Sequence, residues 1–247
     1  MILHTVLSLF GLNEYQSHRA YDRYLSRMIR KNRGDRDLAY AMAIGSLSVE
    51  LFRSQGDCHV AMLKHHGLKD GMALFDLGCG CGRTAQALQR SGWQGTYTGT
   101  DIIERFVAEL RNKCPGYKAF VHRQPSIPVP EASIDLLFHW SVFTHLSLEE
   151  IYLYLADTFR ALKPGGKVIF SFLELTDPEH QTLHFRRVAS MERGKKLPEL
   201  DTFIHRDWIK VWADKIGFTQ LSFTDGTDDT DHPASWQALA VMSKPKS

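Results

Sequence analysis

The sequence contains no apolar stretch long enough to cross a membrane and no marked excess of charge of either sign. Its 30 lysine and arginine residues nearly balance its 28 aspartate and glutamate residues, which leaves a net charge of +2. Binding of nucleic acid or of a lipid surface through overall charge needs a larger imbalance, so neither partner is indicated. There is also no internal repeat and no low-complexity tract.

Cysteine is scarce as well. The four residues are Cys58, Cys79, Cys81 and Cys114, and no two of them have the Cys-x-x-Cys spacing of a zinc site. Reduced thiols of this kind fit a cytoplasmic protein best. Residues 1–12 are apolar in places but have no basic start and no small-residue cleavage site, so we expect a helix that packs on the domain.

The chain is organised around the segment from Leu74 to Ala85, which reads LFDLGCGCGRTA. Its apolar start predicts a buried strand and Thr84 to Gln89 has helical spacing, so Gly78, Gly80 and Gly82 form the turn between them. Residues without a Cβ let the backbone bend sharply and let a ligand come close to it. The unpaired N–H groups that begin the next helix suit a carboxylate, a phosphate or the edge of a ribose.

Two kinds of site use such a turn. Read from Gly80, the pattern Gly-x-Gly-x-x-Ala matches a dinucleotide fingerprint, which would indicate an NAD(P)-dependent oxidoreductase. Three features favour another site. Asp76 precedes the first glycine, where a carboxylate would repel a pyrophosphate but attract an ammonium group. The predicted strand Thr96 to Thr100 leads into Asp101, an acid placed to accept hydrogen bonds from two ribose hydroxyls. Residues Leu162 to Phe170 combine a helix end, a Pro-Gly-Gly turn and a buried strand.

Together these segments resemble the class I S-adenosylmethionine-dependent methyltransferases, over residues 60 to 242. The resemblance implies S-adenosyl-L-methionine as cofactor and a Rossmann-like α/β fold. This fold is a doubly wound, mostly parallel seven-stranded sheet with an antiparallel C-terminal strand, here with added N-terminal helices. We expect one domain, 1–247, and a monomer or homodimer. Its parts are an N-terminal helical cap (1–66), a cofactor-binding core (67–170), a substrate-specificity insertion (171–206) and a C-terminal helix with a strand hairpin (207–247).

The resemblance also assigns residues to the parts of the cofactor. Gly78, Cys79 and Gly80 would allow the methionyl part to approach the backbone closely. Asp76 would bind its ammonium group, directly or through water, and Asp101 would bind the ribose hydroxyls.

Five further positions are assigned to the cofactor on weaker grounds. Ile102 would pack on the adenine, and Arg83 would either face the carboxylate or only cover the helix surface. The family often has an acid that accepts the adenine amino hydrogen; the counterpart here is Gln124, whose amide oxygen can accept but carries no charge. His139 and Ser141 follow the fourth predicted strand, Asp135–Phe138, and open parallel sheets bind ligands at the carboxyl ends of their strands.

His145 is the candidate catalytic residue, because it follows that strand and could orient or deprotonate an acceptor. The alternative is a structural histidine that caps the next helix. A sulfonium methyl group is already electrophilic, so the enzyme has chiefly to align and desolvate an in-line displacement by a nucleophilic oxygen or nitrogen. A small-molecule acceptor is predicted, since no binding domain is appended and no Asn-Pro-Pro-Tyr-type motif follows the fourth strand. A noncatalytic ligand-binding or partner-binding module with the same fold stays an alternative.

No metal site is predicted. His180 and His184 lie four residues apart and could share a metal with Asp177 or Glu179, but no further ligand is identifiable. A polar surface helix is the preferred interpretation of this segment.

Helices are predicted for the N-terminal region, over Leu38–Phe52 and over Asp57–His66 with Asp57 as N-cap. In the family that the chain resembles, helices here cover the cofactor and shape the substrate entrance. Four aromatic residues could serve there or belong to the core: Tyr15, Tyr21, Tyr40 and Phe52.

Overall fold

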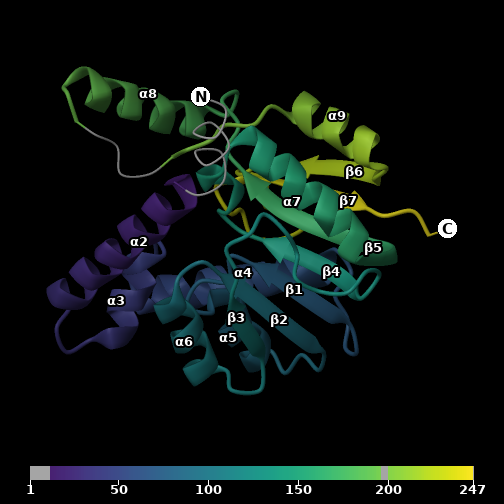
Figure 1. Ribbon diagram of the computed structural model, residues 1–247, viewed down its shortest axis with the longest axis horizontal. Helices are drawn as coiled ribbons and strands as arrows, with labels where there is room; N and C mark the ends of the chain where they lie inside the picture. Colours follow the sequence, from purple (N-terminus) through teal and green to yellow (C-terminus); the bar gives the residue numbers. More distant parts are fainter. Residues whose placement is uncertain (1–11, 196–199, 247) are drawn as a thin grey trace, which may run out of the picture.

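The computed structural model describes residues 12–195 and 200–246, in which one sheet carries helices on both faces (Figure 1). The strands are β1 (Ala73–Leu77), β2 (Thr96–Asp101), β3 (Lys118–Val121), β4 (Ile134–His139), β5 (Leu162–Phe172), β6 (Thr219–Thr224) and β7 (Ala238–Ser243). Their order is β3-β2-β1-β4-β5-β7-β6. Strands β1 to β5 pair in parallel, whereas β7 runs antiparallel to both β5 and β6. The predicted fold class is confirmed, including the insertion of the last strand between β5 and β6.

The strand order reverses between β1 and β4, because the chain runs outward from β1 to β3 and then returns to the other side of β1. Such a reversal leaves a crevice at the carboxyl ends of the two strands. The glycine turn follows β1, and the segment Trp140 to Leu146 follows β4. Both segments therefore meet at this crevice.

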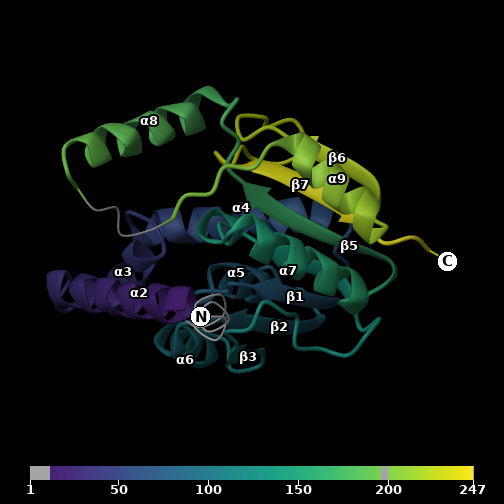
Figure 2. The same ribbon diagram turned by 45° about the horizontal axis from the view of Figure 1, so that its top comes forward.

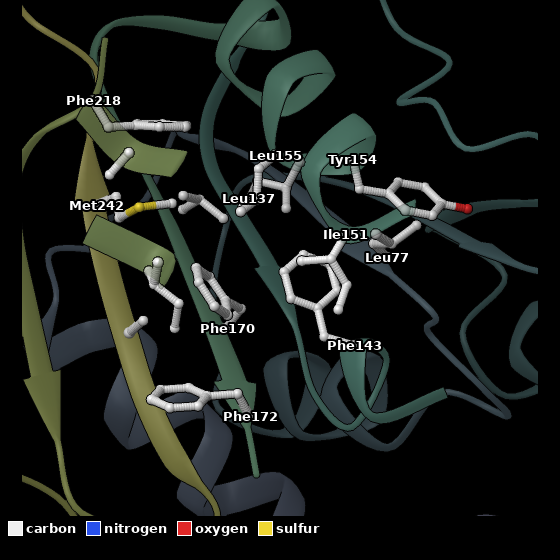
Figure 3. Close-up of a cluster of buried hydrophobic side chains, with 14 of the residues drawn as sticks. Leu77, Leu137, Phe143, Ile151, Tyr154, Leu155, Phe170, Phe172, Phe218 and Met242 are labelled. Carbon is white, nitrogen blue, oxygen red and sulfur yellow. The ribbon is translucent and has the colours of Figure 1, made fainter. Parts of the chain in front are cut away.

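Alternate side chains of each strand pack on opposite faces of the sheet. In β5, Val168, Phe170 and Phe172 belong to one buried cluster and Ile169 to another. The first cluster lies under α7 (Leu148–Ala161) and α9 (Arg206–Ile216), and Figure 3 shows Phe170 and Met242 within it. The second cluster lies under α4 (Val49–His65), α5 (Arg83–Arg90) and α6 (Glu104–Lys113). Because both faces are covered, β7 and the second half of β5 are nearly continuous apolar runs.

The N-terminal helices α2 (Leu12–Lys31) and α3 (Arg36–Ala43) pack on α6 through a third buried cluster. Figures 1 and 2 both place them at the end of the molecule away from the chain's C-terminus. Tyr40 and Phe52 are core residues of this cluster, and Tyr21 packs against it. The helix predicted for residues 1–12 lies outside the described residues except for Leu12, and so does the side chain of Tyr15.

The two predicted helices after residue 38 have the wrong boundaries. Helix α3 ends at Ala43, and Gly45 follows with a φ of +86°. The next helix, α4, begins after Ser48, whose side chain accepts a hydrogen bond from the N–H of Leu51. Asp57 is not an N-cap, because it lies inside α4 and pairs with Arg90 at 2.6 Å. The serine cap and the glycine fix the break about ten residues earlier than predicted.

Strand β5 differs from the prediction at both ends. It begins at Leu162, directly after α7, and continues to Phe172, inside the segment predicted as an insertion. The Pro-Gly-Gly segment is an irregularity of the β4–β5 pairing, with a φ of +77° at Gly165. Helix α8 (Pro178–Glu192) follows β5. Both views show α8 standing out from the sheet (Figures 1 and 2).

Candidate functional site

A cavity of about 670 Å³ opens at the carboxyl ends of β1 and β4. Its inner part is lined by the glycine turn and by the end of β2. Its outer part is lined by α2, by the segment after β4, by α7 and by residues next to β7. The cavity thus joins parts of the chain that lie more than 200 residues apart in the sequence.

The glycine turn is held tightly against β2. The N–H groups of Gly78 and Cys79 both donate to the carbonyl oxygen of Thr100, at 2.8 and 2.9 Å. Gly78 has a φ of +69°, and a Cβ at this position would lie 2.4 Å from Cγ2 of Val142. Only glycine meets both conditions without strain.

Asp101 supports this turn from the end of β2. Its carboxylate accepts hydrogen bonds from the N–H of Gly80 at 2.9 Å and of Ile103 at 2.8 Å. Burial raises the pKa of Asp101 to about 6, although the backbone donors act in the opposite direction. A carboxylate offers about four acceptor positions, and the two backbone N–H groups occupy two of them. Asp101 also lines the cavity, so the other two positions remain for a ligand there.

Asp76 is the second acid of the inner cavity and is only 2% exposed. Its Oδ2 accepts a hydrogen bond from the hydroxyl of Tyr97 at 2.6 Å. Burial raises the pKa of Asp76 to about 7, against the lowering effects of that hydrogen bond and of Arg83. A buried carboxylate is costly unless a cation lies beside it, so this position suits an ammonium group.

Arg83 begins α5 and also lines the cavity. One of its terminal nitrogens donates to Gln55 at 3.0 Å and to Ser46 at 3.4 Å. Its buried Nε has no hydrogen-bond partner within the part of the chain that the structure describes. A half-buried guanidinium whose Nε is a buried, unused donor can pair with an anion that enters the cavity.

His139 and Ser141 have different surroundings although they are two residues apart. The ring of His139 is stacked on Phe170 at 5.2 Å and lies 3.9 Å from the ring of Phe143, outside the cavity lining. Burial lowers the pKa of His139 to about 3, so it stays neutral. Ser141 lines the cavity, has a φ of +56° and accepts a hydrogen bond from Nε2 of Gln237 at 2.6 Å.

His145 lines the outer cavity, in a short 3-10 helix over Phe143–His145. Its Nδ1 lies 3.0 Å from the carbonyl oxygen of Leu200, which can only accept, so Nδ1 carries the hydrogen and Nε2 stays an acceptor. The alternative role as a helix cap is wrong. Ser147 caps α7, together with Glu150 in a capping box.

The two residues assigned to the adenine are placed differently. Ile102 lines the cavity. Gln124 is exposed, and the cavity is lined instead by its neighbours Arg123 and Pro125. The hydrogen bond that involves Gln124 and the cavity wall is made by its backbone oxygen, which accepts from the hydroxyl of Tyr154 at 3.1 Å.

Several lining residues were missed by sequence reasoning. Glu150 and Tyr154 belong to α7, which has the pattern of a scaffold helix, and Trp236 and Gln237 lie just before β7. Nothing in the local sequence around these residues signals a site. Their place depends on how α7 and β7 pack on the sheet.

Comparisons with known proteins agree with this geometry. Residues 74–166 match a family model described as a methyltransferase domain. A demethylmenaquinone methyltransferase of Tropheryma whipplei is 29% identical over 130 residues, which are 52% of this chain and 52% of the relative. A sterol 24-C-methyltransferase of Pneumocystis carinii is 24% identical over 190 residues, 70% of this chain and 46% of the relative. These matches make the chain similar to the class I S-adenosylmethionine-dependent methyltransferases.

Solved structures share the fold of this chain. Magnesium protoporphyrin IX methyltransferase from Synechocystis, solved with bound SAH, has a TM-score of 0.62 at 16% identity. That comparison covers 94% of this chain and all of the other. The chain spans about half the length of the first curated relatives that it matches.

Within residues 12–195 and 200–246, no group of three or more His, Cys, Asp or Glu side chains is arranged to hold a metal ion. Among the helices that the structure describes, none combines the length and the apolar character needed to cross a membrane.

Proposed function

We propose that this protein binds S-adenosyl-L-methionine and transfers its methyl group to a small, largely apolar molecule. The observation that carries the proposal is the charge pattern of the inner cavity, where buried Asp76 and half-buried Asp101 and Arg83 surround the glycine turn. Asp76 suits the ammonium group of the methionyl part, Arg83 its carboxylate and Asp101 the ribose hydroxyls. Gly78, Cys79 and Gly80 supply a wall without bulk, and Ile102 an apolar surface for the adenine.

The remaining assignments are proposed with narrower roles. Ser141 lies in the cavity wall after β4 and belongs to the zone between cofactor and acceptor. His139 lies behind this wall, so we propose that it supports the wall through its contacts with Phe143 and Phe170. Gln124 is proposed to act on the adenine end only through its neighbours Arg123 and Pro125, which line the cavity.

The bound cofactor would supply an electrophilic methyl group on a positively charged sulfur. The protein then has to hold the acceptor in line and exclude water. The outer cavity is suited to an apolar acceptor, because its wall includes Leu146, Leu173, Leu183, Leu200 and Trp236. Two relatives are named for methylation of demethylmenaquinone and of a sterol.

We propose oxygen or nitrogen as the accepting atom, with carbon as a second candidate. Carbon is favoured by the names of relatives, among them the sterol 24-C-methyltransferase. Oxygen is favoured by a potential base in the outer cavity, His145, whose Nε2 is an acceptor. A cytoplasmic location is proposed because all four cysteines are free.

The direct test is turnover. Purified protein would be incubated with S-adenosylmethionine and a panel of quinols, phenols, sterols and amines, and release of adenosylhomocysteine would be measured. We expect release above the acceptor-free rate with at least one apolar acceptor. Binding of adenosylhomocysteine without any turnover over the whole panel would favour the noncatalytic binding module instead.

Cofactor affinity is expected to fall with falling pH because Asp76 must be ionised to bind an ammonium group. With a pKa of about 7, the Asp76 side chain is ionised in about half of the molecules at pH 7 and in about a tenth of them at pH 6. The α-amino group of the cofactor stays protonated over this range. Calorimetry should therefore show an affinity about fivefold lower at pH 6 than at pH 7, with proton release on binding. In an Asp76→Asn variant, cofactor affinity should change less between pH 7 and pH 6 than in the unsubstituted protein. An equal change in both proteins would exclude the binding of the ammonium group by Asp76.

His145→Ala should lower the rate of methyl transfer to a hydroxyl acceptor by roughly 10²- to 10⁴-fold, the usual contribution of a positioned base. The affinity for adenosylhomocysteine should not change, because His145 lies in the outer cavity. His65→Ala is a suitable control, since His65 is an exposed residue at the end of α4. Single-turnover kinetics with the best acceptor of the panel would measure the rate of methyl transfer in both variants. A rate within threefold of the unsubstituted protein would show that no base is needed at this position.

A further inference from the structure

The outer cavity contains a polar pair, Gln237 and Ser141, whose hydrogen-bonding groups are not all used. Gln237 is 8% exposed and lines the cavity at the start of β7. Its Nε2 donates to Oγ of Ser141 at 2.6 Å, and its Oε1 has no hydrogen-bond partner within the described part of the chain. Buried side-chain oxygens of this kind normally have a partner, so an unpaired one in a cavity wall indicates a missing ligand group.

Ser141 leaves the complementary group unused. Its Oγ accepts from Gln237, and its backbone N–H donates to Oγ of Ser171 at 2.8 Å. The hydroxyl proton of Ser141 therefore has to point elsewhere, and Ser141 lines the cavity. The pair offers one donor and one acceptor next to each other. If the amide of Gln237 is turned over, the two roles are exchanged but one of each remains.

The backbone at this pair is held in unusual conformations. Ser141 has a φ of +56° and Trp236, directly before Gln237, a φ of +70°. Positive φ is rare for residues other than glycine and concentrates at functional sites. Two such residues on either side of one hydrogen bond indicate that the chain is constrained to keep Ser141 and Gln237 together.

The constraint on Trp236 comes from two sides. Its N–H donates to the carbonyl oxygen of Gly226 at 2.9 Å, and a Cβ on Gly226 would lie 2.0 Å from the carbonyl oxygen of Trp236. That carbonyl oxygen lies 2.8 Å from Nε2 of His180. Because Nδ1 of His180 accepts the N–H of Glu174 at 3.0 Å, Nε2 carries the hydrogen and donates to Trp236.

His180 is therefore neither a metal ligand nor part of a polar surface. It is fully buried at the start of α8, whereas the rest of this helix lies on the surface as predicted. Its ring also meets the ring of Trp236 edge to face, at 4.9 Å. His180 thus acts as a positioning residue, because it anchors the backbone that presents Gln237.

We propose that Gln237 and Ser141 recognise a hydroxyl group on an apolar, ring-containing acceptor. A hydroxyl is the smallest group that donates and accepts at once, so it satisfies both unused groups of the pair. The rest of the acceptor would lie against apolar side chains of the outer cavity, among them Trp236, Leu173 and Leu183. This inference rests on the proposed function, since it names the class of molecule that the same site takes.

The test uses three bicyclic probes of nearly equal shape: 2-naphthol, 2-methoxynaphthalene and naphthalene. Their dissociation constants would be measured on the full chain saturated with adenosylhomocysteine. We expect 2-naphthol to bind at least tenfold more tightly than naphthalene, with 2-methoxynaphthalene close to naphthalene because it cannot donate. In Gln237→Leu, which keeps the volume but not the amide, the ratio between 2-naphthol and naphthalene should fall below three.

Gln181→Leu serves as the matched control, since Gln181 is exposed on α8, and its ratio should stay as in the unsubstituted protein. A ratio that survives in Gln237→Leu, or equal binding of the three probes by the unsubstituted protein, would overturn the proposal. The same experiment distinguishes failure of the proposed function from failure of the hydroxyl site. If adenosylhomocysteine fails to bind but Gln237-dependent discrimination persists in its absence, the cofactor assignment fails and the hydroxyl site stands.

Discussion

Asp101→Ala is expected to weaken the binding of S-adenosylmethionine by about 10- to 150-fold. Hydrogen bonds to a charged group contribute about 1.5–3 kcal/mol, and the alanine variant would lose those to the ribose. Part of the loss would come from the glycine turn itself, because the N–H of Gly80 donates to the same carboxylate. Calorimetric titration with S-adenosylmethionine measures the effect directly.

Asp135→Asn provides a matched control for the removal of a structural carboxylate. Asp135 also accepts a backbone N–H, that of Ala73 at 2.8 Å, and pairs with Lys163 at 2.7 Å. It lies at the start of β4, away from the cavity lining. Its substitution should lower the melting temperature and leave cofactor affinity within threefold. Unchanged affinity in Asp101→Ala would refute the contact with the ribose.

Gly78→Ala is the second substitution with a large expected effect. The new Cβ would overlap Cγ2 of Val142 at 2.4 Å, and φ at this residue is +69°. The left-handed conformation alone costs roughly 1–2 kcal/mol for a residue with a Cβ. Because the turn must also move away from Val142, we expect at least about a tenfold loss of cofactor affinity, on the scale of 1.4 kcal/mol per factor of ten.

Gly92→Ala separates these two causes. Gly92 has a φ of +72°, close to that of Gly78, but a Cβ there would meet nothing within 4 Å. The Gly92→Ala variant should lose about as much stability through the left-handed conformation as Gly78→Ala does, but it should keep its cofactor affinity. The double variant Gly78→Ala with Val142→Ala relieves the overlap. If its affinity returns fully to that of the unsubstituted protein, the glycine is needed for packing and not for the approach of the ligand.

The inner cavity could be predicted from the sequence because one continuous unit builds it. Asp76, the glycine turn and Asp101 follow one another through a strand, a turn, a helix and a second strand, and β1 and β2 pair side by side. Local spacing is then enough to bring these groups together. The pKa values of the two acids could not be predicted, since the raised pKa of Asp76 depends on burial by distant parts of the chain.

The outer cavity could not be predicted in the same way. Gln237 meets Ser141 only because β7 runs antiparallel to β5, with Ala238 opposite Phe172. That register depends on tertiary packing and leaves no mark in the residues around Gln237. The same holds for His180, whose local pattern is that of an ordinary helix start but whose ring is buried under Trp236.

The most direct test of the central claim is a pair of calorimetric titrations of the purified chain, one with adenosylhomocysteine and one with NAD. If Asp76, Asp101 and the glycine turn form a site for the adenosyl cofactor, adenosylhomocysteine will bind in a 1:1 ratio and NAD will give no binding heat. Binding of NAD together with no heat from adenosylhomocysteine would contradict the proposed site.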